Sequence, residues 1–253
     1  MSLDPKPILA VAAAAAVVGL TVGCGANASG AGPAGAHAAG LPQGAQPVTL
    51  DPAAFTTKID NPWWPMPVGA RWVFREADPG EPVLRVVVTV TRRTKRMADG
   101  VRARVVHDVV RHGGRTIENT LDWYAQDRAG NIWYLGEDTT EYARDGSVST
   151  AGSWEAGVDG AQPGIAVPAH PRAGMRYRQE YHAGDAEDRA VVLSTSGRVR
   201  VPAGRFDDLL TTRDFTPLEP KGTERKYYAR GIGPVLSIAL HSGGREALVR
   251  HTH

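Results

Sequence analysis

The sequence VRARVVHDVVRHGGRTIENTLDWYAQDRAGNIWYLGED, residues 101–138, alternates polar and apolar side chains and contains two glycine turns. In its first part, the alternating residues are Val101, Ala103, Val105 and Val109 against Arg102, Arg104 and Asp108. A period of two puts alternate side chains on opposite faces of a β-strand, so the apolar residues are expected to share one face.

The second part, residues 121–138, predicts one hairpin. Asp127, Gly130 and Asn131 supply the turn chemistry. The two flanking strands each carry a Trp-Tyr pair, which can meet across the hairpin as aromatic pairs (Trp123, Tyr124, Trp133 and Tyr134). These aromatics are expected to support a sheet, with a ligand wall as the alternative.

The same period recurs in residues 86–90, 177–181 and 199–201, and turn signals follow one another about every ten residues. Helical periodicity is limited to one-turn candidates near 51–58 and 205–210. The prediction is a mainly β fold: a single large curved antiparallel sheet or an open or half barrel with few short helices. Because so little helix is available to cover a concave face, we expect that face to form a binding cavity.

Composition excludes several classes of protein. The 253 residues include 29 Lys+Arg and 27 Asp+Glu, with 22% charged and 42% hydrophobic residues. This balance excludes a wholly disordered chain and gives no basic excess that would favour nucleic acid as a partner. The single cysteine excludes an internal disulfide framework and a cysteine-based zinc site. No catalytic or phosphate-binding signature occurs, and no cofactor is expected.

The N-terminus predicts export. Residues 1–23 contain a sixteen-residue uncharged run and are expected to be a signal peptide, followed by Cys24 as a lipid acceptor. Secretion with cleavage after Ala28 and an uncleaved anchor are the alternatives, and all three place the protein outside the cytoplasm. Residues 24–47, rich in Gly, Ala and Pro, are expected to be a flexible tether to the cell membrane. Residues 48–253 are expected to form one β-rich domain.

Three segments supply candidate ligand-binding residues. Trp64 lies in NPWWPMP (61–67), which predicts an end-plug or, alternatively, a stacking platform; one of its two tryptophans is expected to stay near the surface. Trp154, Glu155 and Asp159 lie in GSWEAGVDGAQPGI (152–165), a loop that either carries a site or covers the sheet. Glu180 and His182 share a strand face and could form an acid/base pair. We expect Tyr177 and Tyr181, on the other face, to point inward instead. No metal site is expected, because the acids at 185–188 fit a turn better.

The strings NPWWPMP, WYAQDRAGNIWYLGED, GSWEAGVDGAQPGI, TPLEP (216–220) and KYYARGIGPV (226–235) resemble a family of exported bacterial proteins of uncharacterised function, over most of residues 55–240. This resemblance implies no particular reaction. KYYARGIGPV and VPAGRF (201–206) are also similar to motifs of periplasmic lipoprotein-carrier half-barrels, which implies a curved antiparallel sheet around an apolar cavity.

These observations favour a cell-envelope lipoprotein that binds a hydrophobic or amphipathic ligand or a partner protein in or on its sheet. A secreted hydrolase-like enzyme is the alternative, with Glu155, Asp159 or Glu180 as acid/base residues in the concave pocket. A metal-binding module is the third hypothesis and needs at least three histidines or acids to converge.

Overall fold

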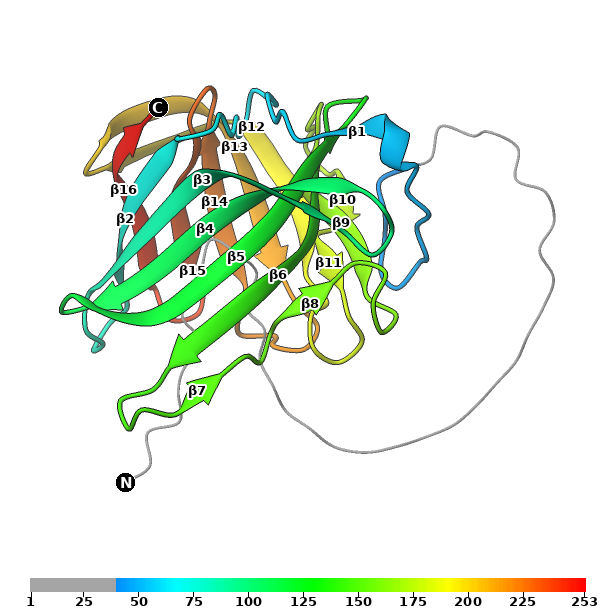
Figure 1. Cartoon of the computed structure of the whole chain (residues 1–253). Helices are drawn as coiled ribbons and strands as arrows, with labels where there is room; N and C mark the ends of the chain where they lie inside the picture. The colour runs from blue at the N-terminus through cyan, green and yellow to red at the C-terminus, as the bar shows by residue number, and fades with distance from the viewer. Residues whose placement is uncertain (1–39) are drawn as a thin grey trace.

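A computed structural model describes residues 40–253, which form β-strands and one short 3-10 turn, with no α-helix in this range (Figure 1). The 3-10 turn is η1 (Pro52–Ala54), and the strands are β1 (Phe55–Thr56), β2 (Arg71–Ala77), β3 (Leu84–Arg96), β4 (Arg102–His112), β5 (Arg115–Asp127), β6 (Ile132–Tyr142), β7 (Val148–Ser149), β8 (Trp154–Glu155), β9 (Gln162–Val167), β10 (Arg176–Arg178), β11 (Glu180–Tyr181), β12 (Arg189–Val201), β13 (Gly204–Phe215), β14 (Glu224–Ala229), β15 (Gly233–Ala239) and β16 (Arg245–Thr252). None of the described residues belongs to a helix of the length and hydrophobicity needed to cross a membrane.

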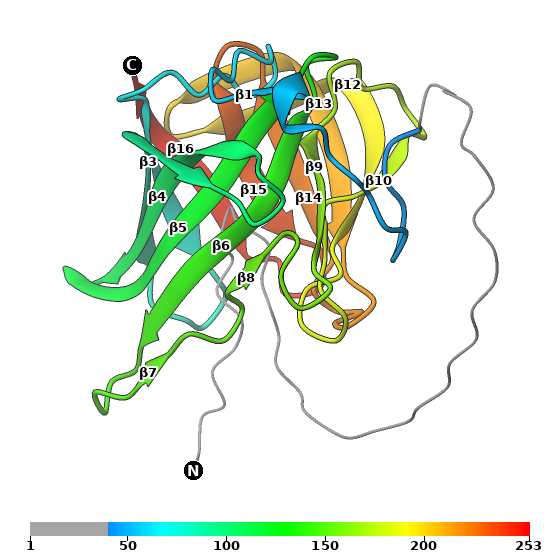
Figure 2. The same cartoon turned by 45° about the vertical axis from the view of Figure 1, so that its right-hand side comes forward.

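The strands form a nearly closed antiparallel barrel (Figures 1 and 2). Thirteen of them follow one path, β10-β12-β13-β14-β15-β16-β2-β3-β4-β5-β6-β9-β11. The two ends of this path, β10 and β11, are separated in the chain by Gln179 alone. One extended segment therefore pairs with β12 through its first half and with β9 through its second half, and the seam between β9 and β12 has no continuous ladder.

Residues 41–46, which we call the strap, lie along this seam. The guanidinium of buried Arg178 donates to the carbonyls of Gly44 and Gln46 in the strap, at 2.8 and 2.7 Å, and to Pro163 of β9 at 2.8 Å. Gln43 Nε2 donates to the carbonyl of Arg176 at 2.6 Å. The chain is therefore hydrogen-bonded to the barrel several residues before Val48, because the buried guanidinium of Arg178 takes its acceptors from the strap.

One end of the barrel is closed by residues 59–67, which we call the plug. Trp64 projects inward, with its ring centroid 5.4 Å from that of Tyr124 and 6.2 Å from that of Tyr228. Gly233, at φ 102°, lies directly against Trp64, where any side chain would collide with the indole. Trp63 is also buried, so the expectation that one tryptophan stays near the surface is wrong. The plug buries both rings because Arg230 covers Trp63 at 3.9 Å.

Most of the predicted architecture is confirmed. Residues 121–138 form the β5–β6 hairpin with Tyr124 opposite Tyr134, and Val86, Val88 and Val90 lie in the core. The helix expected near 205–210 is wrong, because these residues pair with β12 and β14 as part of β13. Near 51–58 only η1 is helical. The expectations for the signal peptide, for Cys24 and for the tether up to residue 39 concern residues outside the described range.

Candidate functional site

The barrel interior carries charged side chains where a hydrophobic core is usual. Strand register connects Thr212, Lys226, Ser237, Glu246 and Glu76 into one row across β13, β14, β15, β16 and β2. A second row connects Asp108, Thr120 and Thr139 across β4, β5 and β6. Side chains in one row of a sheet share a face, and these rows face the lumen.

Eight carboxyl side chains are buried there, and we call them the carboxyl layer: Glu76, Asp108, Glu118, Asp122, Glu137, Glu180, Asp214 and Glu246. Among residues 40–253, the buried cations are Lys226 and Arg178, and Arg178 is engaged by carbonyls at the seam. The ammonium of Lys226 lies 3.4 Å from Asp214 and 3.5 Å from Glu224. The lumen therefore holds many more potential negative charges than positive ones.

An aromatic layer connects the plug to the carboxyl layer. It is a chain of contacting rings formed by Trp64, Tyr124, Tyr134, Trp154 and Tyr228. Tyr124 stacks on Tyr134 with centroids 5.0 Å apart, and Trp154 meets Tyr134 edge-on at 5.4 Å. The hydroxyl of Tyr134 donates to Asp122 at 3.0 Å, which joins the two layers.

Several polar atoms of these layers have no hydrogen-bond partner among the residues described. Both carboxyl oxygens of Glu180 lack one, as do one oxygen each of Asp108, Asp214 and Glu246. The indole N–H of Trp154 interacts with Glu180 and opposes the rise in the pKa of that carboxyl, without reaching full hydrogen-bond geometry. A buried polar atom without a partner costs about 1–3 kcal/mol, so these atoms are the part of the lumen best able to bind a polar group.

The charged side chains that face the lumen keep little exposed surface. A barrel of this many strands is wider than the eight-stranded barrels that side chains alone can fill. The side chain of Lys226, which points into the lumen in mid-strand, keeps 10% of its surface exposed. Small polar side chains, among them Thr212, Ser237 and Thr120, lie beside the charged ones in these rows.

Burial controls the protonation of the carboxyl layer. Desolvation raises the pKa of Asp108 to about 8, with a further contribution from Asp122. Desolvation likewise raises the pKa values of Glu118 and Asp122 to about 7. It raises the pKa values of Glu137 and Glu180 well above the ordinary glutamate value, and neighbouring carboxylates add to both shifts. Part of the carboxyl layer is therefore protonated near neutral pH.

The structure brings three of the sequence-predicted residues to this lumen. Glu180 is 1% exposed and joins the carboxyl layer, while Trp64 and Trp154 belong to the aromatic layer. The expectation that Glu180 points outward while the tyrosines point inward is wrong: Tyr177 and Glu180 are both buried, because the chain changes partner strand at Gln179.

The other three candidates lie elsewhere. Glu155 binds Lys95 at 2.7 Å and the backbone N–H of Ala98 at 2.9 Å, away from the lumen. Asp159 is exposed in the turn before β9, at φ 48°. Tyr181 is half-buried and pairs with Gln162. The hydrolase hypothesis required carboxylates among Glu155, Asp159 and Glu180 to converge, and in the structure they lie apart.

The remaining carboxyl residues were missed by sequence reasoning. The prediction that Asp108 lies on the face opposite Val105 and Val109 is correct. Charged residues are ordinarily exposed, so the pattern gave no reason to expect that this face lines the lumen and that Asp108 is buried. In residues 40–253, no three His, Cys, Asp or Glu side chains are arranged to hold a metal ion.

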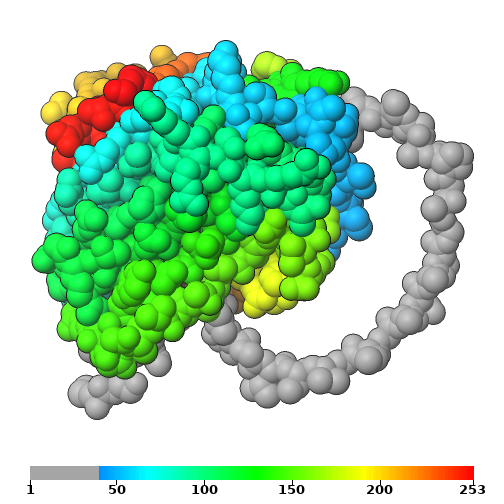
Figure 3. Space-filling model, viewed as in Figure 1, coloured from blue at the N-terminus to red at the C-terminus, as the bar shows by residue number. Residues whose placement is uncertain are grey.

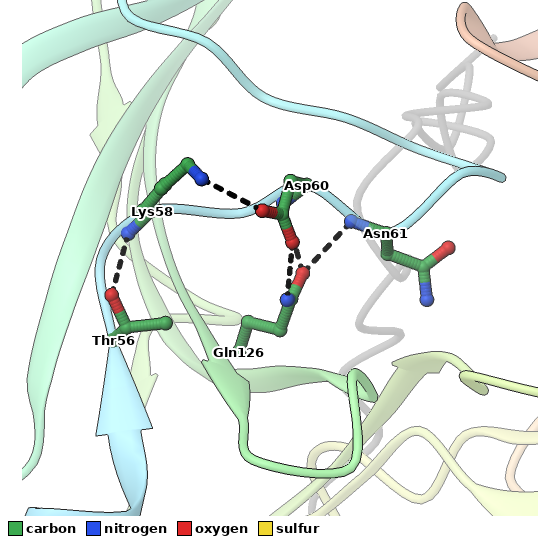
Figure 4. A network of polar contacts seen from close by, with 5 residues as sticks. All are labelled: Thr56, Lys58, Asp60, Asn61 and Gln126. Atoms are coloured by element: carbon green, nitrogen blue, oxygen red, sulfur yellow. Dashed lines mark hydrogen bonds and ion pairs between the residues drawn. The ribbon is translucent and has the colours of Figure 1, made fainter.

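A cavity of about 520 Å³ lies outside the plug and is lined in part by Asp60, Trp63, Gln126, Arg172 and Arg230. Among its polar groups, Asp60, Asn61 and Gln126 bond to one another and hold the plug (Figure 4). Gln126 accepts the backbone N–H groups of Asp60 and Asn61 at 2.9 and 2.8 Å and donates to Asp60 at 2.7 Å. Because Arg230 covers Trp63, this cavity offers no open indole face for stacking.

Comparison with known proteins identifies no family. No protein-family model and no curated protein matches the chain. Among solved structures, the fold is similar to a crystal structure titled a "putative lipoprotein" from Parabacteroides distasonis ATCC 8503, with a TM-score of 0.40 and 10% sequence identity, covering 76% of this chain and 99% of that one.

Proposed function

We propose that the protein is an extracytoplasmic lipoprotein, tethered to the cell membrane through Cys24, that binds an amphipathic amine inside its barrel. The observation that carries the proposal is the set of carboxyl oxygens without partners on facing walls of the lumen, on β4, β11, β13 and β16. The sequence of residues 1–24 supports the export and the anchor.

The two layers match the two parts of such a ligand. An ammonium group has three N–H donors, which fit several carboxylate oxygens at once. The aromatic layer, with Trp64 and Tyr124 in contact, can pack against an apolar body and can also hold a cation by its ring faces. A wholly apolar ligand would leave the carboxyl oxygens unpaired, and therefore fits this lining less well.

The test compares octylamine, octanoate and octanol by thermal shift and calorimetric titration. Octylamine is expected to raise the melting temperature and bind, while octanoate, with the same chain and the opposite charge, is not. Glu180→Gln should weaken octylamine binding about tenfold or more, because a charge-assisted contact is lost.

Asp159→Asn is the matched control, since Asp159 is an exposed carboxylate in a backbone conformation that asparagine accepts. It should leave binding unchanged. Equal binding of all three probes, or no binding of octylamine to a folded wild-type protein, would contradict the proposal.

A further inference from the structure

Three arginines stand in one row on the outside of the barrel, and we call them the arginine row. Arg75 of β2 is directly opposite Arg85 of β3, which is directly opposite Arg111 of β4. Arg75 lies between lumen-facing Phe74 and Glu76, so its own side chain points outward. Neighbouring strands are about 4.8 Å apart, so three guanidinium groups project from a span of about 10 Å.

The side-chain contact recorded for this row is a hydrogen bond from Arg111 to Thr116, at 3.4 Å. Like charges directly opposite each other on neighbouring strands are destabilising. An anion bridging the guanidinium groups would remove this repulsion, and arginine forks suit phosphate and carboxylate groups.

An apolar groove adjoins the row. Its volume is about 390 Å³, and it is lined by the three arginines together with Val73, Val83, Leu84 and Val249. Val83 and Val249 are 48% and 42% exposed, which is high for valine. Strands β3 and β4, each of which contributes one arginine to this lining, form part of the face seen in Figure 3. Positive charge beside exposed aliphatic surface is complementary to a molecule with an anionic head and a hydrocarbon chain.

We propose that this groove is a binding site for an anionic lipid, with the phosphate or carboxylate head on the arginine row and the acyl chain along Val83, Leu84 and Val249. The site is separate from the lumen and carries the opposite charge. It would place the outer surface of β2, β3 and β4 against an anionic lipid while the lumen remains available to its own ligand.

The test measures binding of soluble dioctanoyl phosphatidylglycerol, dioctanoyl phosphatidylcholine and inorganic phosphate by calorimetry, with the chain carrying Cys24→Ser to remove the expected acyl acceptor. The anionic lipid is expected to bind more tightly than the other two. The triple variant Arg75→Gln/Arg85→Gln/Arg111→Gln should weaken its binding about tenfold or more.

The matched control removes three other outward arginines, Arg213→Gln/Arg225→Gln/Arg245→Gln, from β13, β14 and β16. It should change lipid binding less than about twofold, and both triple variants should keep their circular dichroism spectrum and their octylamine binding. Equal losses in the two triples would reduce the effect to general charge attraction and overturn the proposal.

A second variant tests the apolar part. Val83→Asn/Val249→Asn changes two exposed side chains, so the fold should tolerate it. It should weaken lipid binding while leaving phosphate binding unchanged. If inorganic phosphate binds as tightly as the lipid, with the same dependence on the arginine row, the site is for a free anion and the lipid proposal fails.

Discussion

Lys226 is the residue on which the charge balance of the lumen depends. Its ammonium contacts Asp214 and Glu224, and the same charge lowers the pKa of Asp188, which burial raises to about 7. Burial alone would lower the pKa of a lysine, but the surrounding carboxylates, Glu224 first, raise that of Lys226 well above its ordinary value. The lysine is thus held charged and acts as an internal counter-ion for only part of the carboxyl layer.

Replacing Lys226 by methionine should therefore destabilise the protein by about 3–5 kcal/mol at pH 8, because one partner of a buried ion pair is lost. The loss should be smaller at pH 5, where more of the facing carboxyl groups are protonated. Denaturant unfolding at both pH values measures this. Lys58→Met, which breaks the exposed pair with Asp60, should cost at most about 1 kcal/mol at either pH, and a similar cost for the two variants would contradict the assignment.

The extended segment formed by β10, Gln179 and β11 is the element that closes the barrel. Gly164 of β9 lies against the backbone of Gln179, where a side chain would collide with it, so the close approach at the seam requires glycine. Arg178 then connects this segment to β9 and to the strap through carbonyl acceptors alone. The seam is therefore maintained by Arg178, Gln43 and the strap rather than by a full ladder of backbone bonds.

Arg178→Lys should loosen the strap, because an ammonium cannot reproduce the planar fork that reaches Pro163, Gly44 and Gln46 together. Hydrogen exchange of residues 41–48 and 176–181 should become at least about tenfold faster, as expected when hydrogen bonds to a charged group are lost. Exposed Arg176, whose side chain makes no recorded contact, provides the control Arg176→Lys. Unchanged exchange in Arg178→Lys would show that the strap is held by other contacts.

Sequence patterns predicted these elements unequally. The hairpin of residues 121–138 could be predicted because alternation and turn chemistry are local signals. The seam could not, since Arg178, Gly44 and Gln46 are far apart in the chain and no local pattern indicates that one segment has two partner strands. Trp64, Trp154 and Glu180 were identified as candidates from their segments, but the carboxyl layer was not, because Asp108 and Glu246 look like ordinary exposed residues of alternating strands.

At the scale of the whole molecule, charge is separated between the inside and the outside of one sheet. The net charge of +2 conceals a carboxyl layer within the barrel and an arginine row on its outer surface. Composition alone therefore suggested no charged ligand, although each face of the sheet is strongly polarised. The distribution, rather than the sum, indicates what the protein can bind.

This separation predicts an unusual dependence of stability on pH. The folded pKa values of Asp108, Glu118 and Asp122, at about 8, 7 and 7, lie above the ordinary carboxyl values of the unfolded chain. Between about pH 4 and pH 8 the folded state thus binds more protons than the unfolded state, and the free energy of unfolding falls as pH rises. The melting temperature should be higher at pH 5 than at pH 8.5, and a melting temperature that rises over this range would refute charge burial in the lumen.

The partner change at Gln179 also has a mechanical consequence. Among the described residues, the strap is the first part of the chain that bonds to the barrel, and it is joined through Arg178 to the line where the sheet lacks a continuous ladder. Tension on the chain before the strap would reach this line before any fully paired strand. The barrel should therefore open at a lower force when it is pulled from its N-terminus than when it is pulled from Thr252, which is paired within β16.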